Sequence, residues 1–396
     1  MVPENKLLRY VLGKDLVLLQ TSSWKHGYIW ECKKAQSGPE VCPRCAGLCT
    51  RKAGKAKSLV RDEPVYGNPI WIRILKHRYY CPRCRKPFTE SVPGIFPRRR
   101  TTQRLRKAIL KDCHDVTDLK RVSRRNFCSR ALVGKIFYEQ MEIKLRERRN
   151  APWPRVLGID EHRFKRGENG FAEFVTMFTD VGRRRAFEMG HSKSTASLIE
   201  QVSHIHGRDR VEVITMDLAR GYRSLAEQLF PQARIVADKF HVLRLITPAL
   251  IRERKNIHGH RQDLGVRRRL LMNREKLAYY ERSDLDRYLS QHPKLNELYR
   301  YKERLSQFYR IKGFERAKVA FEKLTNDMKG SEYEEIKRLR RTLITWQKEV
   351  LEYFRSRFTN AFTEAMNSIA KLVQRRGCGY RSFKNYRIRT LSACPA

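Results

Sequence analysis

The sequence predicts a multidomain protein that combines α and β structure. Two copies of one tetrapeptide, Cys-Pro-Arg-Cys, stand near the N-terminus at residues 42–45 and 81–84. Short apolar strands alternate with helices from residue 152 to residue 241, as in an α/β sheet. The pattern then becomes helical and highly charged as far as residue 354. A chain of 396 residues has room for two or three domains of ~150 residues each.

The charge balance indicates a polyanionic partner. Lys and Arg number 85 and Asp and Glu number 42, so the formal net charge is +43. A folded protein tolerates such self-repulsion most readily when nucleic acid neutralises it. The hydrophobic fraction of 41% and the aromatic fraction of 10% are ample for folded cores, which excludes a disordered basic tail.

No membrane segment is expected. No run approaches the ~20 uninterrupted apolar residues of a spanning helix. Residues 16–19 form a short apolar patch, but no long hydrophobic region or small-residue cleavage site follows it. We therefore expect an intracellular protein that binds nucleic acid.

The doubled tetrapeptide predicts one structural Zn²⁺ ion. Cys42 and Cys45 form one pair of thiolates, and Cys81 and Cys84 form the second, so that together they complete a tetrahedral site. The proline favours the turn, and the arginine helps to keep the thiolates ionised. Because the segment between the pairs is longer than in a compact finger, we expect a zinc-ribbon-like module with strands between them, one at residues 70–75.

Redox motifs or disulfides are the alternative for these pairs, which the doubled spacing in a reducing compartment disfavours. Cys32 and Cys49 flank the first pair and are the substitutes if one ligand is misassigned. The thiols at positions 113, 128, 378 and 394 show no metal spacing.

A helix-turn-helix module is predicted for residues 96–150. The pattern indicates three short helices: one capped by Thr101 or Thr102, one around residues 116–122 and one that opens near Ser129. A basic run precedes the first helix, and two cations face outward on the third, where they can contact phosphates. The expected DNA contacts here are Arg98, Arg99, Arg100, Arg130 and Lys135. A small helical linker bundle with solvated charges is the alternative.

Two carboxylates are expected at strand ends of the α/β segment. The strands are expected at residues 155–160, 171–179, 185–189, 211–217 and 233–237, with helices at 195–204 and 221–229. Asp160 and Asp217 end two of these strands, which could be neighbours in one sheet. A pair of Mg²⁺ ions, ~3.5–4 Å apart, would turn such carboxylates into phosphate ligands. The alternative is that both residues only form turns.

The remainder of the chain supplies helices. The heptad-like series Leu298, Tyr301, Leu305 and Phe308 indicates bundle packing more than a dimerising coiled coil. A helix that starts near residue 359 or 360 carries Glu364, the best candidate for a third carboxylate, on one polar face with Asn367 and Lys371. Cations then interleave with aromatics, a pattern that offers phosphate contacts and stacking surfaces. The DNA contacts expected in this segment are Lys371, Arg375, Arg376 and Arg381.

Over nearly its whole length the chain resembles insertion-sequence transposases of the ISL-three type. The resemblance rests on the two cysteine pairs with residues 86–90 behind the second, on 158–161, on Met216-Asp217 with Tyr222, on 236–242, on 360–367 and on 375–383. It implies a zinc-binding domain at residues 1–95, a helix-turn-helix at 96–150 and a DDE catalytic domain of RNase H-like fold. That domain would comprise residues 151–242 and 355–396, with an all-helical insertion at 243–354. The C-terminal segment, residues 392–396, is short and departs from the usual C-terminal segment of the family.

The resemblance also implies a catalytic triad of Asp160, Asp217 and Glu364 that holds two Mg²⁺ or Mn²⁺ ions. Asp238 and His241 resemble an Asp-x-x-His element of related transposases. They could tune the metal site, orient a scissile phosphate or cap the next helix. Glu161 would point to the opposite face of its strand.

The implied function is DNA transposition in the bacterial cytoplasm, in association with the nucleoid. Such an enzyme binds the terminal inverted repeats of its element, cleaves a phosphodiester and transfers the freed 3′-OH to target DNA, as a homodimer or a higher synaptic oligomer. Two alternatives are a sequence-specific DNA-binding regulator with an inactive α/β domain and an RNase H-like nuclease that cuts without joining.

Overall fold

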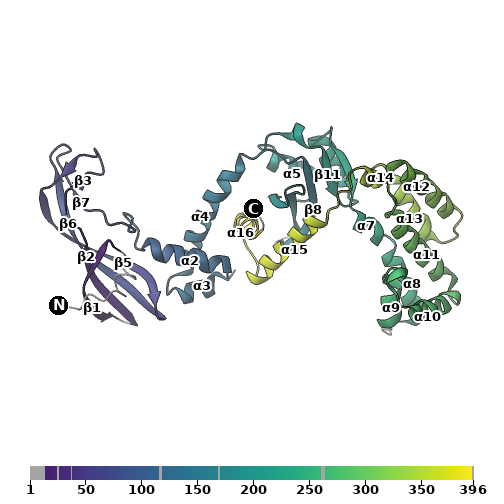
Figure 1. Cartoon of the computed structure of the whole chain (residues 1–396), viewed down its shortest axis with the longest axis horizontal. Helices are drawn as coiled ribbons and strands as arrows, with labels where there is room; N and C mark the ends of the chain where they lie inside the picture. The colour runs from purple at the N-terminus through teal and green to yellow at the C-terminus, as the bar shows by residue number, and fades with distance from the viewer. Residues whose placement is uncertain are drawn as a thin grey trace. The chain divides into compact units, whose positions relative to one another are not determined.

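The computed structural model describes residues 14–24, 26–36, 38–115, 118–167, 170–259 and 264–394 (Figure 1). The chain divides into two compact units. The first comprises Met1–Lys144 with Arg376–Cys378, and the second comprises Leu145–Arg375 with Gly379–Ala396. No helix in the described ranges is long and apolar enough to cross a membrane.

A five-stranded sheet forms the body of the first unit. Its order is β1-β2-β6-β5, with β7 also paired to β6, and only β2 and β6 run parallel. Alternate residues Ile70, Ile72 and Ile74 of β6 are buried, as the period of two of a half-buried strand requires. The strands are β1 (Leu16–Trp24), β2 (Gly27–Lys34), β5 (Lys52–Val65), β6 (Asn68–Cys81) and β7 (Lys86–Thr89), and a two-stranded hairpin adds β3 (Glu40–Val41) and β4 (Leu48–Cys49).

Three helices follow this sheet, as the sequence predicts: α2 (Gln103–Asp115), α3 (Leu119–Arg125) and α4 (Arg130–Arg149). The Thr102 hydroxyl accepts the backbone N–H of Leu105 (3.1 Å) and so caps α2. Of the expected second helix, positions 116 and 117 lie outside the described residues.

A second five-stranded sheet organises the second unit, in the order β10-β9-β8-β11-β12. The pairs β10–β9 and β9–β8 are antiparallel, whereas β8–β11 and β11–β12 are parallel. The crossover from β11 to β12 is made by α6, as a parallel pair requires. The strands are β8 (Val156–Arg166), β9 (Ala172–Asp180), β10 (Arg185–Gly190), β11 (Val213–Met216) and β12 (Arg234–Ala237).

Helices cover both faces of this sheet. On one face lie α5 (Thr195–Val202) and α6 (Arg220–Leu229), whose Leu198 and Leu225 join the core of Leu157 and Ile159 from β8. On the other face α15 (Ala361–Arg376) lies beside β8, although the two are far apart in sequence, and α16 (Phe383–Ala393) follows it (Figure 1). A Cβ on Gly158 of β8 would lie 2.1 Å from Thr363 Oγ1 of α15, so glycine is required for this close approach.

The segment before α15 is a bundle of short helices that shares its hydrophobic core with the sheet. Leu298, Tyr301, Leu305 and Phe308 are buried within it, which confirms bundle packing within the chain. The helices are α7 (Lys239–Arg244), α8 (Thr247–His258), α9 (Leu264–Leu271), α10 (Tyr279–Ser290), α11 (Pro293–Phe308), α12 (Phe314–Lys329), α13 (Glu334–Thr345) and α14 (Gln347–Ser356), and the 3-10 turns are η1 (Arg208–Arg210) and η2 (Arg274–Lys276).

One expectation about the sheet is wrong. Asp160 does not end its strand, because β8 continues to Arg166. The continuation keeps a strand pattern, since His162 and Phe164 are buried on the same face as Asp160 and β9 pairs with β8 along this stretch. The prediction for Asp217 is correct, because it directly follows β11.

Candidate functional site

Two neighbouring strands place Asp160 and Asp217 close together. In the parallel pair β8–β11, Ile159 lies opposite Met216, and each aspartate is the next residue. Asp160 is 9% exposed. Burial, and then the charge of Asp217, raise the pKa of the Asp160 carboxyl to about 7. Each oxygen of Asp160 nevertheless accepts one hydrogen bond, from the backbone N–H of Glu161 and from Asn367 Nδ2, both at 2.8 Å.

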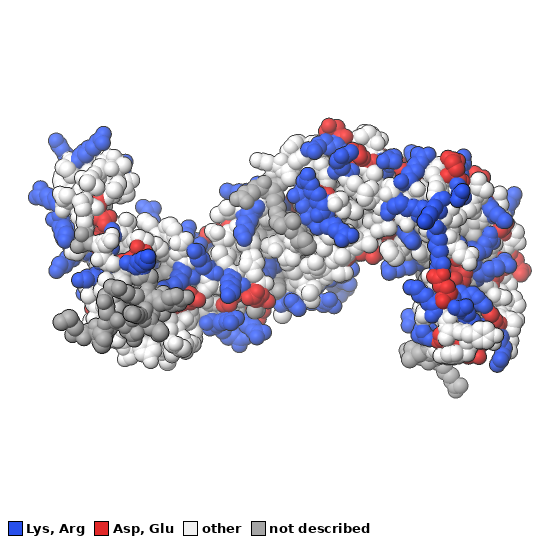
Figure 2. All heavy atoms as spheres, viewed as in Figure 1, with Lys and Arg blue, Asp and Glu red and all other residues white. Residues whose placement is uncertain are grey.

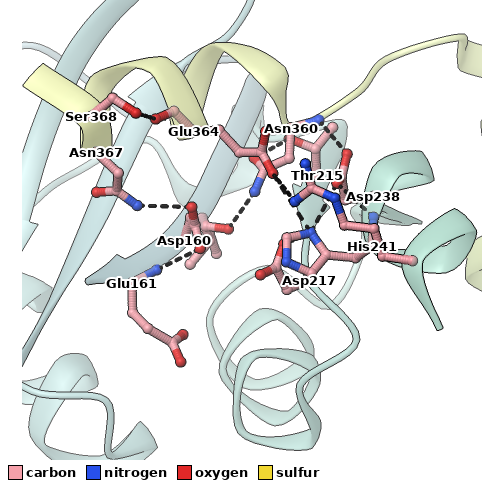
Figure 3. A network of polar contacts seen from close by, with 12 residues as sticks. Asp160, Glu161, Thr215, Asp217, Asp238, His241, Asn360, Glu364, Asn367 and Ser368 are labelled. Atoms are coloured by element: carbon pink, nitrogen blue, oxygen red, sulfur yellow. Dashed lines mark hydrogen bonds and ion pairs between the residues drawn. The ribbon is translucent and has the colours of Figure 1, made fainter. Parts of the chain in front are cut away.

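Asn360, directly before α15, connects that helix to the strands. Its backbone N–H donates to Asp238 Oδ1 (3.1 Å), and its side-chain Nδ2 donates to the carbonyl oxygen of Ile159 (3.0 Å). Its Oδ1 accepts the hydroxyl of Thr215 (3.1 Å). Asn360 is fully buried, so these bonds replace water completely. One helical turn later, Glu364 reaches the same pocket as the two aspartates (Figure 3).

Asp238 and His241 lie at the start of α7. Asp238 is fully buried and caps the helix, since its Oδ2 accepts the backbone N–H of His241 (3.1 Å) and lies 3.0 Å from His241 Nδ1. His241 Nδ1 also lies 2.9 Å from Asp217 Oδ1 and 3.8 Å from Glu364 Oε1. Hydrogen bonds with Asp217 and Asp238 raise the pKa of His241 to about 10, so its ring is a cation among these carboxylates.

These side chains line one open pocket of about 340 Å³. Asp160, Asp217 and Glu364 bring carboxylates to it beside basic groups, and Glu161 also lines it, with its carboxylate directed away from Asp160 (Figure 3). The lining residues are Asp160, Glu161, Asp217, His241, Arg244, Glu364, Asn367, Ser368 and Lys371. Carboxylates beside cations suit a ligand that itself combines metal ions with phosphate.

The donor set fits a divalent metal. Asp217 Oδ1 is buried and its close partner is His241 Nδ1 at 2.9 Å, so its second lone pair is open to a ligand. Ligand atoms of Asp217, Asp238 and His241 lie within 4.8 Å of one another. Asp238 has three protein N–H partners, two of them on Oδ2, whereas each oxygen of Asp160 accepts only one hydrogen bond. The oxygens left for a metal are therefore those of Asp217, Asp160 and Glu364.

Sequence reasoning missed two groups behind the pocket. Asn360 and His162 were not expected to act there, although His162 follows Asp160 by two strand positions and therefore shares its face. His162 is 2% exposed, and burial lowers its pKa to about 4. Asn367 was expected on a polar face with Glu364, but it is buried and in contact with Asp160.

The four paired cysteines come together in the first unit. Their Sγ atoms lie within 4.8 Å of one another, with Cys42 4.0 Å from Cys84 and Cys45 3.6 Å from Cys81. These distances exclude disulfides. The backbone N–H of Cys84 donates to Cys81 Sγ (3.4 Å), which lowers the pKa of the Cys81 thiol to about 6. A tetrahedral set of four thiolates fits a structural zinc ion.

The two substitute cysteines differ in position. Cys49 packs against this cluster, whereas Cys32 lies in the separate core of the sheet. Cys32 is therefore excluded as a ligand at this site.

Basic side chains gather in a groove of about 700 Å³ within the first unit. Leu59, Trp71 and Leu132 give it apolar walls, and six cations line it: Arg61, Arg98, Arg99, Arg100, Arg106 and Lys135. Arg130 is exposed on α4 but does not line the groove. Figure 2 shows Lys and Arg spread over every part of the face drawn, with Asp and Glu in smaller groups.

The basic segment after α15 differs from the expectation. Tyr386 is fully buried and stacks on Phe164, with ring centroids 4.9 Å apart, and Phe383 stacks on His191 at 4.7 Å. These rings are used by the fold, so the predicted base-stacking surface is wrong for them. The cations of this segment, Arg375, Arg376 and Arg381, are exposed, and Lys371 lines the carboxylate pocket.

Known transposases share these segments with the chain. A family model described as "Transposase" matches residues 157–390, and one described as "zinc-finger of transposase IS204/IS1001/IS1096/IS1165" matches residues 38–84. The transposase for insertion sequence element IS1001 of Bordetella parapertussis is 22% identical over 368 residues, which cover 90% of this chain and 89% of that protein. The chain therefore belongs to the ISL3 family of insertion-sequence transposases, DNA-cleaving enzymes of the DDE type.

Proposed function

We propose that Asp160, Asp217 and Glu364 are the catalytic carboxylates of this transposase and hold two Mg²⁺ or Mn²⁺ ions. The observation that carries the proposal is that β8, the end of β11 and α15 direct these three side chains into one pocket. When bound, the ions lower the pKa of water and neutralise the charge that develops on a phosphate under attack.

The other residues of the pocket have supporting roles in this proposal. Arg244 and Lys371, on the rim, place positive charge where the scissile phosphate would lie. His241 holds Asp217 by a 2.9 Å contact, and Asp238 holds His241 in turn. Water would first cleave a phosphodiester at the element end, and the freed 3′-OH would then attack target DNA in the same pocket. The mixed sheet with carboxylates on adjacent strands supports an RNase H-like core in residues 151–242 and 355–396, interrupted by the helices of 243–354.

The first unit would recognise the terminal inverted repeats. The cysteine cluster would hold one Zn²⁺, and α2, α3 and α4 would form the helix-turn-helix of residues 96–150, after a zinc-binding domain at 1–95. The basic groove beside these helices supports the role of Arg98, Arg99, Arg100 and Lys135 in contacting the phosphate backbone. Arg130, Arg375, Arg376 and Arg381 are exposed and would add contacts.

Two element ends must meet before strand transfer, so we propose a dimer or a larger synaptic assembly. Transposition would take place on the DNA of the bacterial nucleoid.

The test uses the full chain, Mn²⁺ or Mg²⁺, and a labelled duplex that carries the inverted repeat flanking the coding sequence. We expect binding to the duplex, a nick at the repeat boundary that leaves a 3′-OH, and covalent joining of that end to a plasmid. Binding without a nick in either metal would contradict the enzymatic role and favour the regulator. Nicking without joining would favour the nuclease.

A further inference from the structure

A line of hydrogen bonds runs from the pocket to the C-terminal helix. Asn367 Nδ2 donates to Asp160 Oδ2 (2.8 Å), Asn367 Oδ1 lies 2.8 Å from His162 Nδ1, and His162 Nε2 lies 2.6 Å from the hydroxyl of Tyr386. Asn367, His162 and Tyr386 are at most 2% exposed. The DDE mechanism itself uses none of these three groups.

The donor and acceptor groups of these side chains are compatible with one assignment of the hydrogen bonds along this line. When Asp160 holds a metal it is ionised and only accepts, so the amide nitrogen of Asn367 must face it and the amide oxygen must face His162. Nδ1 of His162 then has to carry the proton, because an amide oxygen cannot donate. Nε2 is left as an acceptor for the hydroxyl of Tyr386. Every member thus fixes the orientation of the next.

The far end of the line is anchored. The ring of Tyr386 stacks on Phe164 of β8, with centroids 4.9 Å apart and planes 23° apart. Arg387, the next residue of α16, makes an ion pair with Glu188 of β10. The position of the Tyr386 hydroxyl is therefore set by the sheet as well as by α16.

We propose that Asn367, His162 and Tyr386 are positioning residues that hold the Asp160 carboxylate in its metal-binding orientation, and that α16 thereby forms part of the active site. This inference rests on the proposed role of Asp160 as a metal ligand. The bonds from Asn367 and from the backbone of Glu161 occupy one lone pair on each oxygen of Asp160, which leaves the others for a metal. Such outer-shell bonds orient ligands, and their loss typically weakens metal binding about 10–100-fold.

The test measures Mn²⁺ binding to zinc-loaded full-length protein by electron paramagnetic resonance, with thermal melting as the check on folding. The variants are Asn367→Ala, Tyr386→Phe and the double variant. Tyr386→Phe keeps the stacked ring and removes only the hydroxyl. Tyr309→Phe is the matched control, because that buried hydroxyl makes no hydrogen bond.

We expect Asn367→Ala to weaken Mn²⁺ binding by about 10-fold or more, Tyr386→Phe to weaken it by a smaller factor, and Tyr309→Phe to leave it unchanged. In the Asn367→Ala background, Tyr386→Phe should have no further effect, since the line is already broken. A merely structural role would give the same factor in both backgrounds, and that result would overturn the inference. Unchanged Mn²⁺ affinity in the folded Tyr386→Phe variant would overturn it as well.

Asp160→Ala separates this inference from the proposed function. If Asp160→Ala binds Mn²⁺ as the unaltered protein does, the proposed metal site is wrong. If Asp160→Ala loses an ion while Asn367→Ala and Tyr386→Phe do not weaken binding, the metal site stands and only the positioning line is wrong.

Discussion

The cysteine cluster and the carboxylate pocket are both suited to metal ions, but the chain builds them in opposite ways. The cysteine ligands come in two local pairs, each within one tetrapeptide, and the four thiol groups largely contact one another. The carboxylates come from β8, the end of β11 and α15. Asp160 is hydrogen-bonded to Asn367, 207 positions away, and Asp217 contacts His241 of α7. A site of the first kind depends on its metal for its shape, whereas a site of the second kind is shaped by the fold before any metal binds.

The burial of the two sites supports this distinction. Behind the carboxylates stand fully buried polar groups, Asn360, Asp238 and Thr215, whose hydrogen bonds are complete without a ligand. Behind the cysteines stand the rings of Tyr79 and Phe88, stacked with centroids 6.0 Å apart. Substitution of a cysteine ligand should therefore unfold the cysteine cluster, whereas substitution of a carboxylate should abolish catalysis and leave the fold intact.

The largest effect is expected from the ligands of the carboxylate pocket. Asp160→Asn, Asp217→Asn and Glu364→Gln should each lower the cleavage rate of a labelled element end by about 10³-fold or more, because they remove a negative charge that holds metal. The melting temperature and the affinity for the duplex should stay near those of the unaltered protein. Glu161→Gln is the control, since that carboxylate points away from Asp160, and it should retain most of the activity. A fully active Asp160→Asn variant would remove Asp160 from the triad.

The next largest effect is expected from the zinc ligands, and it is of a different kind. Cys81→Ser should abolish zinc binding, which contributes on the order of 10 kcal/mol to folding in small zinc domains. Loss of the first unit should then weaken duplex binding at least tenfold, while the second unit keeps its own melting transition. Cys378→Ser, at an exposed thiol, is the control. Metal analysis and calorimetry measure both effects, and a Cys81→Ser variant that retains zinc would contradict the four-thiolate site.

The same difference explains what the sequence could predict. The cysteine cluster was predictable in full because its spacing is local, and so were Asp217 and the strand that precedes it. The extent of β8 was not predictable. A carboxylate after an apolar run is typical of a strand end, and the pairing with β9 that continues β8 beyond Asp160 is a tertiary feature. Asn360 and His162 could not be recognised, since an amide or a ring acquires its role only from residues about two hundred positions away. The aromatics after α15 were misread because their packing on Phe164 and His191 is a tertiary contact.

A change in backbone packing should have an intermediate effect. In Gly158→Ala the new methyl group would meet Thr363 Oγ1 at 2.1 Å and Thr179 Oγ1 at 2.5 Å, so α15 must move away from β8. We expect a loss of about 1–3 kcal/mol in the free energy of unfolding and a fall in cleavage larger than the stability loss explains, because Glu364 moves with the helix. Gly134→Ala is the control, since the nearest atom to its Cβ, Leu119 Cδ1, is 3.8 Å away. Equal activity of the two variants would show that the close approach of α15 does not matter for the pocket.

The smallest effect, and the most direct comparison of the two sites, comes from two buried hydroxyls that each stand two residues before a ligand. Thr215 precedes Asp217 and donates to Asn360 Oδ1 (3.1 Å), and Tyr79 precedes Cys81 and donates to the carbonyl oxygen of Gly38 (3.2 Å). Thr215→Val should cost about 1–3 kcal/mol in stability, because it leaves the buried Oδ1 of Asn360 unsatisfied. Tyr79→Phe should cost less, because Gly38 is exposed and water can bond its carbonyl oxygen.

Their effects on metal binding should differ. Thr215→Val should weaken Mn²⁺ binding several-fold, since Asn360 orients the start of the helix that carries Glu364. Tyr79→Phe should leave the zinc stoichiometry and affinity unchanged, because the four thiolates position one another around the ion. Zinc competition with a chelator and Mn²⁺ titration measure the two outcomes. If Tyr79→Phe weakened zinc binding as much as Thr215→Val weakens Mn²⁺ binding, the cysteine site would also depend on its scaffold, and the contrast between the two sites would be lost.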